Sequence, residues 1–487
     1  MNLLIIPEIK NLLKIIYRFS CKKKVKLYLV GGFLRDIILK REKENPDIDF
    51  LLKKNSIDFS RHLAKKIKSG FVILDKERGY SRLVKRIKEK IYTLDFTNFR
   101  GKTLEEDLLR RDFTINTLTL ELEKIFIPSS IKDLLIDPYG GRKDLDKKLI
   151  RAVSNFTFDE DPLRILRAFS LAAIFNFQIE KKTLRLIKQK KEKIAYVSFE
   201  RIRDELFKIL ETDNAFHYLV KLDKLGILEI IFPPIKMMRG INQGPYHHLD
   251  VWQHTLETIR QLEKLIQETK RNKNIQNYLN EKISPDRRRR ALIKLGALLH
   301  DIGKPLARKR EGRKTKFHGH ERIGLEITEQ ITQRLKLSND EKEALEKMVY
   351  WHLRPGYLSE IKNISSRAKF RFFRDAEKEA VSILLISLAD QRATRGPLTC
   401  DESRKNHERL SFNLIKEYFR KQKEKKLVRL ITGDDLIQIF KLEPSPLIGE
   451  ILSEVEELQA IGKIKTKKEA LKVAKKIINK TSYKKKQ

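Results

Sequence analysis

Apolar residues fall in short runs over the first part of this 487-residue chain and recur with helical spacing over the rest. From residue 151 onwards, apolar positions at intervals of three and four predict one helix after another. Before that point, runs rich in β-branched and aromatic residues predict strands at 26–30, 47–52, 71–74 and 91–96. The pattern therefore predicts an α+β fold, with a mixed sheet and helices first and an all-helical remainder.

Two interruptions divide the pattern further. The turn cluster Asp-Pro-Tyr-Gly-Gly at 137–141 ends the α+β part. A charge-rich stretch at 267–290 interrupts the helices, and we expect a loop or a mobile insertion there. We therefore expect a head over 1–150, a helical neck and body over 151–245, a second helical domain over 246–400 and a helical tail over 401–487.

A pair of aspartates is the most informative feature of the head. Asp47 and Asp49 occupy alternate positions of a predicted strand, and alternate residues of a strand point to the same face. Both carboxylates can therefore reach one pair of metal ions. Gly31 and Gly32 separate the preceding strand from a helix, where backbone N–H groups can approach a phosphate. Phosphates above two acids are typical of two-metal nucleotidyl transfer.

Two further residues of the head are candidates for the same site. Arg35 lies in the helix after the glycines and would help to seat phosphates. Asp95 lies in the strand predicted at 91–96, where a third carboxylate would complete the metal cage. The alternative for Asp95 is an ordinary solvated acid of a strand.

Two charged segments follow the predicted strands. Arg110, Arg111 and Asp112 fall between two apolar helical stretches. Arginines there can hold a triphosphate or a ribose hydroxyl, and the alternative is an exposed ion-pair patch.

Glu160, Asp161 and Arg164 form the second segment and can share one helical face. A carboxylate that accepts from an exocyclic amine, beside a guanidinium that donates to a ring acceptor, selects cytosine and adenine over uracil and guanine. Asp161 before Pro162 would also serve as an ordinary helix N-cap.

The net charge points to a polyanionic partner. Lys and Arg number 105 against 66 Asp and Glu, a formal charge of +39. Such an excess repels itself and suits a nucleic acid, whereas a Lys-rich proteome is the alternative explanation. Cys21 and Cys400 form no disulfide framework, which indicates a reducing compartment. With no secretory leader and no apolar run of about 18 residues, we expect a cytoplasmic protein without a membrane span.

The strings LVGGFLRDIIL, DIDF, EEDLLRRDFTIN, DPYGGRKDL, EDPLRILRA and ERIRDEL follow one another over roughly residues 25–210. Together they resemble class II tRNA nucleotidyltransferases, the CCA-adding enzyme and poly(A) polymerase family of the DNA-polymerase-β-like superfamily. The resemblance implies a polymerase-β-like head that adds C and A to a tRNA 3′ end, with Mg²⁺ as cofactor and CTP and ATP as substrates. The tRNA acceptor arm would be the partner, and the oligomeric state stays open.

The resemblance also assigns roles to residues. It implies that Asp47 and Asp49 bind the metal ions, that Arg110, Arg111 and Asp112 select the ribose, that Glu160, Asp161 and Arg164 form the protein template for the base, and that Arg167 is a further basic position of the template helix.

One departure leaves several products open. Asn98 is followed almost directly by the helix at Leu104, where many CCA-adding members carry a flexible loop. Members that add only CC are similar in lacking it. The alternatives are a CC-adding or A-adding enzyme, a poly(A) polymerase, or a phosphohydrolase whose head is an RNA-binding module.

Eight of the ten histidines lie in the helical second half. His300 and Asp301 end an apolar helix, which we expect Gly303 to terminate in the left-handed conformation. A neutral imidazole beside a carboxylate can bind a transition metal.

The strings YHHLDVWQHTLET, LGALLHDIGKP, FHGHERIG, YWHLRPG and SLADQRATRG resemble the HD phosphohydrolase superfamily. The resemblance implies that a divalent transition metal is held by His254, His300, Asp301 and Asp390, with His320 and His352 as the extra positions of two-metal versions. The segment after residue 430 resembles the tail of HD-bearing members, which we expect to grip the tRNA through phosphates.

Overall fold

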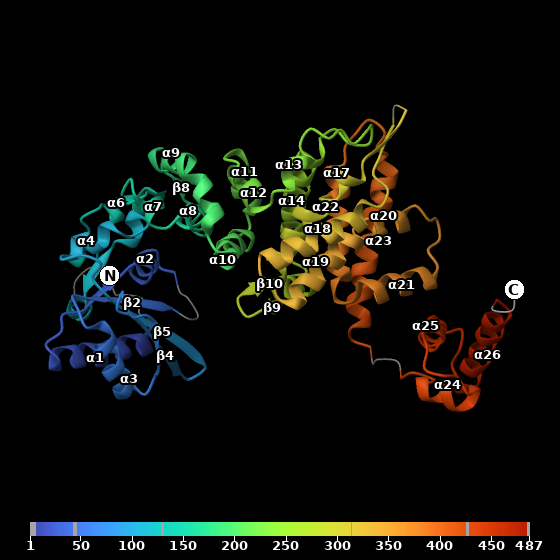
Figure 1. Cartoon of the computed structure of the whole chain (residues 1–487), viewed down its shortest axis with the longest axis horizontal. Coiled ribbons are helices and arrows are strands. Elements are labelled where there is room, and N and C mark those ends of the chain that lie inside the picture. Colours follow the sequence, from blue (N-terminus) through green and yellow to red (C-terminus); the bar gives the residue numbers. More distant parts are fainter. Residues whose placement is uncertain (1–5, 42–45, 128–130, 313, 425–427, 485–487) are drawn as a thin grey trace. The chain divides into compact units, whose positions relative to one another are not determined.

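The computed structural model describes residues 6–41, 46–127, 131–312, 314–424 and 428–484 (Figure 1). The chain forms two compact units. The first unit comprises Met1–Thr212 and Lys221–Ile231, and the second comprises Asp213–Val220 and Phe232–Gln487.

The first unit is built on a six-stranded mixed sheet with the strand order β3-β4-β5-β2-β1-β6. The β2–β5 pair is parallel and the other neighbouring pairs are antiparallel. Its strands are β1 (Tyr28–Val30), β2 (Asp47–Leu52), β3 (Gly70–Asp75), β4 (Tyr80–Ile87), β5 (Lys90–Asn98) and β6 (Thr119–Glu121).

Helices surround this sheet and continue beyond it as the neck. They are α1 (Pro7–Lys22), α2 (Gly32–Ile38), α3 (Ser56–Ile67), α4 (Leu104–Leu109), η1 (Thr114–Asn116), η2 (Leu122–Phe126), α5 (Ile131–Leu134), α6 (Gly141–Asp146), α7 (Thr157–Glu160), α8 (Arg164–Phe175), α9 (Lys181–Lys190), η3 (Lys191–Tyr196), α10 (Phe199–Leu210) and α12 (Ile227–Ile231). The division between the two units falls within α11 (Ala215–Lys224). Two short strands, β7 (Leu149–Ile150) and β8 (Gln178–Ile179), pair with each other.

The four strands predicted from the sequence are present, but β4 and β6 were not predicted. Arg82, Lys85 and Arg86 interrupt the apolar positions of β4, and β6 is only three residues long. A short or charge-rich strand lacks the alternation on which such a prediction depends.

The two faces of the sheet have different roles. Leu29, Phe50 and Phe96 point to the face that α1 and α3 cover, where they form the core of the head. Figure 1 shows α1 and α3 on the same side of the strands. Asp49 pairs directly with Val30 of β1 and with Asp95 of β5. Because directly paired residues share a face, the two acids lie on the face that α1 and α3 leave uncovered.

The second unit is helical around α22, which is apolar on all sides and buried from Ala380 to Ala389. Its larger elements are α13 (Ile235–Met238), α14 (Val251–Glu268), α15 (Lys273–Asn280), α16 (Arg289–Leu299), α17 (Lys304–Ala307), α18 (His320–Arg334), α19 (Asn339–Trp351), α20 (Arg354–Ser359), α21 (Ser366–Ala376), η4 (Glu377–Glu379), α22 (Ala380–Ala393), α23 (Asp401–Lys421), α24 (Gly433–Phe440), α25 (Pro446–Ala460) and α26 (Lys467–Lys484).

The prediction of a loop at 267–290 was wrong. This stretch contains α15, the start of α16 and an irregular hairpin of β9 (Lys282–Ser284) with β10 (Arg287–Arg288). Ile275, Tyr278 and Leu279 of α15 are buried. These three buried residues dock α15, although the polar and charged residues around them hide the apolar pattern.

The expected role of Gly303 was also wrong. Its φ is −82°, so it is not left-handed. A Cβ atom built on Gly303 would lie 2.1 Å from the carbonyl oxygen of His320 and 2.5 Å from the amide nitrogen of Gly324. Glycine is required there because α18, which begins at His320, packs directly against the backbone.

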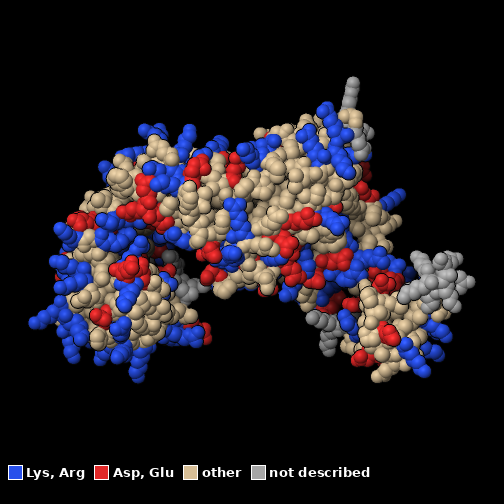
Figure 2. Space-filling view, viewed as in Figure 1, with Lys and Arg blue, Asp and Glu red and all other residues tan. Residues whose placement is uncertain are grey.

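No described helix is long and apolar enough to span a membrane. Lys and Arg side chains are spread over the face of the molecule shown in Figure 2, with Asp and Glu among them. The net charge is therefore distributed over the visible face and is not confined to one tail.

Candidate functional site

The paired aspartates lie at the start of β2. Asp47 is exposed and Asp49 is half-buried. Burial raises the pKa of Asp49 to about 6, with Asp95 and Asp47 acting in the same direction and Arg111 and Arg167 opposing them. Because burial disfavours the charged form of Asp49, a nearby cation would stabilise that form. Mg²⁺ prefers oxygen ligands such as carboxylates. The residues present therefore fit a magnesium site.

Asp95 is close to this pair but is already bonded. Arg82 donates to both of its oxygens at 2.8 Å, and the Tyr80 hydroxyl donates to Oδ2 at 2.7 Å. Asp95 is only 5% exposed. The structure thus places the predicted third carboxylate directly across from Asp49 and adds two partners, Arg82 and Tyr80, that the sequence did not indicate.

Gly31 connects β1 to α2 beside the aspartates. Its φ of +80° is in the left-handed region, and a Cβ atom there would lie 3.3 Å from Oδ2 of Asp49 and 3.5 Å from Nη1 of Arg111. A side chain at this position would be strained and would press on both groups. Gly31 therefore leaves room between a carboxylate and a guanidinium, where the sequence predicted a phosphate.

A buried hydrogen-bond network links α2 to the neck helix α8. The Arg35 guanidinium donates to Oδ1 of Asn116 at 2.5 Å, and Nδ2 of Asn116 donates to Asp112 at 3.0 Å. Asp112 also forms an ion pair with Arg167 at 2.9 Å. The pKa of Asp112 lies below its ordinary value, because Arg167 and the hydrogen bonds from Asn116 and the Phe113 amide outweigh the opposite effect of its burial.

Asn116 is the member of this network that sequence reasoning missed. It lies in the string RRDFTIN, four residues after Asp112. Its amide orientation follows from its partners, because the oxygen faces a cation and the nitrogen faces a carboxylate. The network therefore joins a residue predicted to bind phosphate with a residue predicted to select ribose.

The predicted template residues are arranged differently from the expected shared face. Glu160 accepts from Arg164 at 3.1 Å, but Asp161 is extended and forms an ion pair with Arg201 of α10 at 2.7 Å. The Asp161 side chain also accepts from the Leu163 amide, but α8 begins at Arg164 with Leu163 as its N-cap, so Asp161 does not cap this helix as expected. Asp161 and Arg164 are near each other in the chain but are held by different partners.

Arg164 is positioned by backbone groups of the preceding segment. Its guanidinium donates to the carbonyl oxygens of Arg110 at 2.8 Å and of Arg111 at 3.3 Å. Arg110 itself is exposed, whereas the Arg111 side chain is 16% exposed and contacts Asp107. Arg164 thus ties the RRD segment to α8, which brings the predicted ribose and base residues into one region.

The histidines of the second unit form two adjoining groups that could each hold a metal ion. One group is His254, His300 and Asp390, and the other is Asp301, His320 and His352. Within each group the potential ligand atoms lie within 4.8 Å of one another. The structure therefore brings together all six residues that the sequence predicted, from α14, α16, α18, α19, α22 and the turns after them.

Backbone carbonyls orient three of these imidazoles. His300, His320 and His352 each direct Nδ1 at the carbonyl oxygen three residues earlier, at 2.6 to 2.8 Å. This turns Nε2 of each ring toward the centre, where Nε2 of His320 lies 3.4 Å from Nε2 of His352, an arrangement typical of metal-ligating histidines. Burial lowers the pKa of His352 to about 3, so its ring is neutral at pH 7. A neutral ring is the form that binds a metal.

Orphaned polar atoms make the strongest case that this centre fits a metal. Nε2 of His300 and both oxygens of Asp301 are buried without a hydrogen bond of good geometry among the described residues. Such atoms are costly unless they are ligands. The Nζ atom of Lys304 lies 2.6 Å from Asp301 and 2.7 Å from the side-chain oxygen of Gln243. Lys304 and Gln243 were not among the predicted site residues.

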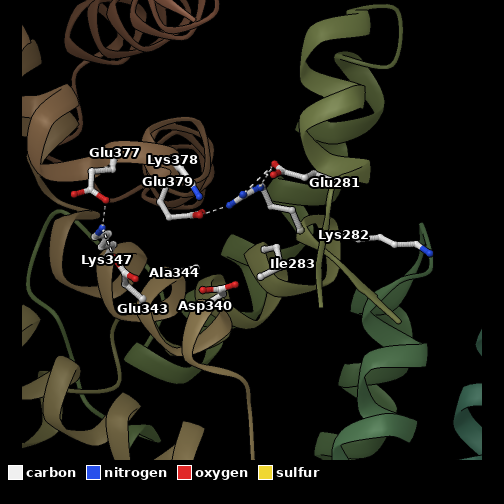
Figure 3. A pocket seen from close by; sticks show the side chains of 11 residues that line it. Glu281, Lys282, Ile283, Asp340, Glu343, Ala344, Lys347, Glu377, Lys378 and Glu379 are labelled. Carbon is white, nitrogen blue, oxygen red and sulfur yellow. Dashed lines mark hydrogen bonds and ion pairs between the residues drawn. The ribbon is translucent and has the colours of Figure 1, made fainter. Parts of the chain in front are cut away.

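A polar pocket of about 210 Å³ in the second unit has a different character (Figure 3). Arg289 bonds to Glu281 and Glu379, and Lys347 bonds to Glu343 and Glu377. Because these charges pair with one another across the pocket, we interpret it as a structural ion-pair network.

Three family models match the chain. The poly A polymerase head domain matches residues 27–151. A model described as the probable RNA and SrmB- binding site of polymerase A matches residues 176–238. The HD domain matches residues 251–395.

Curated relatives match over most of the chain. The A-adding tRNA nucleotidyltransferase of Deinococcus radiodurans is 30% identical over 453 residues, which cover 91% of this chain and 93% of the relative. The CC-adding tRNA nucleotidyltransferase of Geobacter sulfurreducens is 30% identical over 443 residues, which cover 91% of this chain and 90% of the relative. The multifunctional CCA protein of Actinobacillus pleuropneumoniae is 31% identical over 343 residues, with 66% and 73% covered.

Solved structures share the fold. An apo CCA-adding enzyme superposes with a TM-score of 0.63 at 22% identity, over 96% of this chain and 94% of that one. The Thermotoga maritima CCA-adding enzyme in complex with tRNA gives a TM-score of 0.60 at 23% identity, over 98% of this chain and 96% of that one. At these identities the likeness establishes the α+β head and helical remainder, and nothing finer.

Proposed function

The chain belongs to the tRNA nucleotidyltransferase family, and on this premise we propose that it transfers CMP or AMP units from CTP or ATP to a tRNA 3′ end. The observation that carries the proposal is the placement of Asp47 and Asp49 on one face of β2, beside Gly31 and Arg111. The proposal is template-independent synthesis of the CCA end, with the tRNA acceptor arm as the bound partner.

Asp47 and Asp49 would hold two Mg²⁺ ions, with Asp95 as a further candidate. When bound, Mg²⁺ neutralises the triphosphate and lowers the pKa of the attacking 3′-hydroxyl. Two arginines of the chain would also bind the negative charge of the triphosphate. Nη1 of Arg111 lies 3.5 Å from where a Cβ atom of Gly31 would be. Arg35 belongs to α2 and is held by Asn116. These two arginines would seat the phosphates, and Asp112 would accept from a ribose hydroxyl.

Base choice is proposed for Arg164 and Asp161. The backbone bonds of Arg164 to Arg110 and Arg111 fix its guanidinium. Asp161 would accept from the exocyclic amine of cytosine or adenine through a second lone pair of an oxygen, because one of its oxygens already accepts from Arg201 and the other from the Leu163 amide. The arrangement favours bases with an amine beside a ring acceptor.

The second candidate function is partial synthesis of the CCA end, in which the chain adds only CC or only A. The short connection at residues 99–103, between the end of β5 and the start of α4, favours it. Extension of tRNAs that end at the discriminator base, at C and at CC tests these alternatives, with CTP, ATP or both supplied. Two C followed by one A supports complete CCA addition. Two C alone supports a CC-adding enzyme, A on the CC end alone an A-adding enzyme, and long A tracts a poly(A) polymerase.

We also propose that the histidine centre of the second unit is a divalent-metal phosphohydrolase site. Nε2 of His300 and both oxygens of Asp301, which are buried without a hydrogen bond of good geometry among the described residues, support it. A transition metal bound there would supply an activated water. Hydrolysis of a simple phosphate ester such as p-nitrophenyl phosphate with added Mn²⁺ tests this. Activity that Asp301→Asn abolishes supports the proposal, and equal rates for the variant and the wild type oppose it.

A further inference from the structure

We propose that a basic and aromatic groove on the head is a second nucleotide-binding surface, which holds phosphates and one base of either a free nucleotide or a single-stranded RNA segment. This head groove is lined by Lys23, Lys24, Val25, Lys26, Tyr28, Lys53, Lys54, Asn55, Asp58, Phe59, His62 and Phe99. The inference goes beyond the transfer reaction, because none of these residues belongs to the predicted catalytic set.

The head groove lies on the same sheet as the aspartates, towards the other end of the strands. Tyr28 pairs with Leu51 and Val30 pairs with Asp49, so Tyr28 shares the face of Asp49 two residues further along. At about 3.3 Å per residue, Lys53 lies about 13 Å along the chain from Asp49. A ligand in the head groove is therefore distinct from one at Asp49 but close enough to belong to the same bound RNA.

The charges of the head groove are unbalanced. Within the described part of the chain, the ammonium groups of Lys23, Lys24, Lys53 and Lys54 have no ion pair or hydrogen bond, and all four residues are exposed. Lys26 is engaged by Glu121 at 2.5 Å. Four uncompensated cations around one hollow repel each other, and an anion relieves that repulsion.

Local structure explains only in part why these four lysines lie together. Lys23 and Lys24 follow the C-terminal end of α1, where the helix dipole stabilises cations. Lys53 and Lys54 follow a strand, which has no comparable dipole. The second pair therefore has no structural reason of this kind to lie beside the first.

Two aromatic rings line the same head groove. The rings of Tyr28 and Phe99 lie 5.9 Å apart at 46°, and both side chains are half-buried. The Phe99 amide donates to the Leu52 carbonyl at 3.0 Å, which fixes its position after β5. A base can stack on such a ring, a contact worth about 1–3 kcal/mol.

Size and composition together favour a nucleotide over a simple anion. The head groove has a volume of about 500 Å³, within the roughly 300–1,000 Å³ of typical ligand pockets. Cations beside partly exposed rings are the usual means of binding unpaired nucleotides. A bare phosphate would use the lysines but would have no use for the rings.

The test is binding of a labelled, unstructured 12-nucleotide RNA to the full chain in EDTA, which stops transfer. Lys53→Glu/Lys54→Glu is compared with Lys65→Glu/Lys66→Glu, which makes the same charge change at exposed positions of α3 outside the head groove. We expect the first pair to weaken binding at least tenfold and to lower the salt slope by about 2. The second pair should change affinity less than threefold. Equal losses for the two pairs would overturn the proposal.

Competitors distinguish the two sources of the nucleotide, and Tyr28→Leu tests the stacking. ATP that displaces the RNA from the head groove, where tripolyphosphate does not, identifies a free nucleotide as the ligand. Displacement by unlabelled RNA but not by ATP identifies an RNA strand. In both cases Tyr28→Leu should weaken binding about fivefold or more. If tripolyphosphate competes as well as ATP and Tyr28→Leu has no effect, the groove recognises charge alone and the proposal fails. Transfer by the same variants is measured separately, so that a failure here leaves the catalytic assignment untouched.

Discussion

The side-chain amide of Asn116 donates to the carboxylate of Asp112 at 3.0 Å while its oxygen accepts from Arg35 at 2.5 Å. All three residues are buried. One carboxamide therefore positions two groups of opposite charge, a guanidinium proposed to seat phosphates and a carboxylate proposed to bind the ribose. The first prediction follows from this relationship.

Asn116→Asp should impair transfer more than Asn116→Ala. The aspartate would face Asp112 and repel it, whereas alanine only removes a hydrogen-bonding partner, at about 1–3 kcal/mol. We expect about a tenfold loss of kcat/KM for alanine and a hundredfold loss for aspartate, with weaker discrimination of CTP against dCTP in both. Single-turnover rates with the two nucleotides measure this. Unchanged ribose discrimination in both variants would contradict a positioning role for Asn116.

Arg164→Ala should relax base choice. The guanidinium holds the RRD segment through backbone bonds and is the proposed donor to the base. We expect the preference for CTP over UTP to fall about tenfold or more, since one lost charged hydrogen bond is worth about 1.5–3 kcal/mol. Transfer rates with each nucleotide give the preference, and Arg201→Ala is the matched control because it frees Asp161 without touching Arg164. A preference that survives intact in Arg164→Ala would count against the template role.

Glu341 should make the second unit sensitive to acid. Its carboxylate accepts from Arg287 at 2.5 and 2.8 Å and from the Ser338 amide at 2.9 Å. Burial alone would raise the pKa of Glu341, but these bonds outweigh it and hold the pKa below the ordinary 4.5. Because the folded pKa is lower than the unfolded one, the carboxylate stabilises the fold above about pH 4.5, and this stabilisation is lost as the pH falls through the folded pKa.

Glu341→Gln should therefore lower the free energy of unfolding by about 3 kcal/mol at pH 7, and the deficit should shrink below about pH 4. Glu343→Gln on the same helix is the control, because Glu343 forms an exposed pair with Lys347 worth under about 1 kcal/mol. Calorimetric melting across pH 3–8 measures both variants. A deficit for Glu341→Gln that is constant with pH would contradict the assignment.

Divalent metal should stabilise the second unit through the histidine centre. Mn²⁺ at a hundred times its dissociation constant adds about 2.7 kcal/mol to the folded state. We expect the thermal midpoint to rise by several degrees in wild type and to fall back on chelation. Asp301→Asn should melt at the same temperature with and without Mn²⁺. Equal Mn²⁺ shifts in the two proteins would show that the metal binds elsewhere.

Sequence patterns predicted the parts of this molecule that depend on local spacing. Asp47 and Asp49 share a face because a strand has a period of two, and the six residues predicted as HD-type ligands lie in two adjoining groups, although their role as ligands stays a prediction. The partners that hold the site were not predictable in this way. Asn116 is 81 residues from Arg35, and a contact across such a separation leaves no periodic trace. Arg82 was hidden in a charge-rich strand for the same reason that β4 itself was missed.

Two of the wrong predictions, those for residues 267–290 and for Gly303, have related causes. The helix α15 is anchored by a few buried residues among many charges, so composition alone suggested a loop. Gly303 was expected to end a helix in the left-handed conformation, although glycine is required there by the approach of α18 from elsewhere in the fold. Both depend on tertiary packing, which single-sequence patterns do not contain.

The central claim is that Asp49 supports nucleotidyl transfer to a tRNA 3′ end. The most direct measurement is single-turnover incorporation of one labelled CMP or AMP with Mg²⁺, for wild type and for Asp49→Asn, which keeps the shape of the side chain but removes its charge. We predict a rate at least about a thousandfold lower for the variant, equivalent to about 4 kcal/mol, with tRNA binding nearly unchanged. Transfer by Asp49→Asn at a rate near wild type would contradict the account.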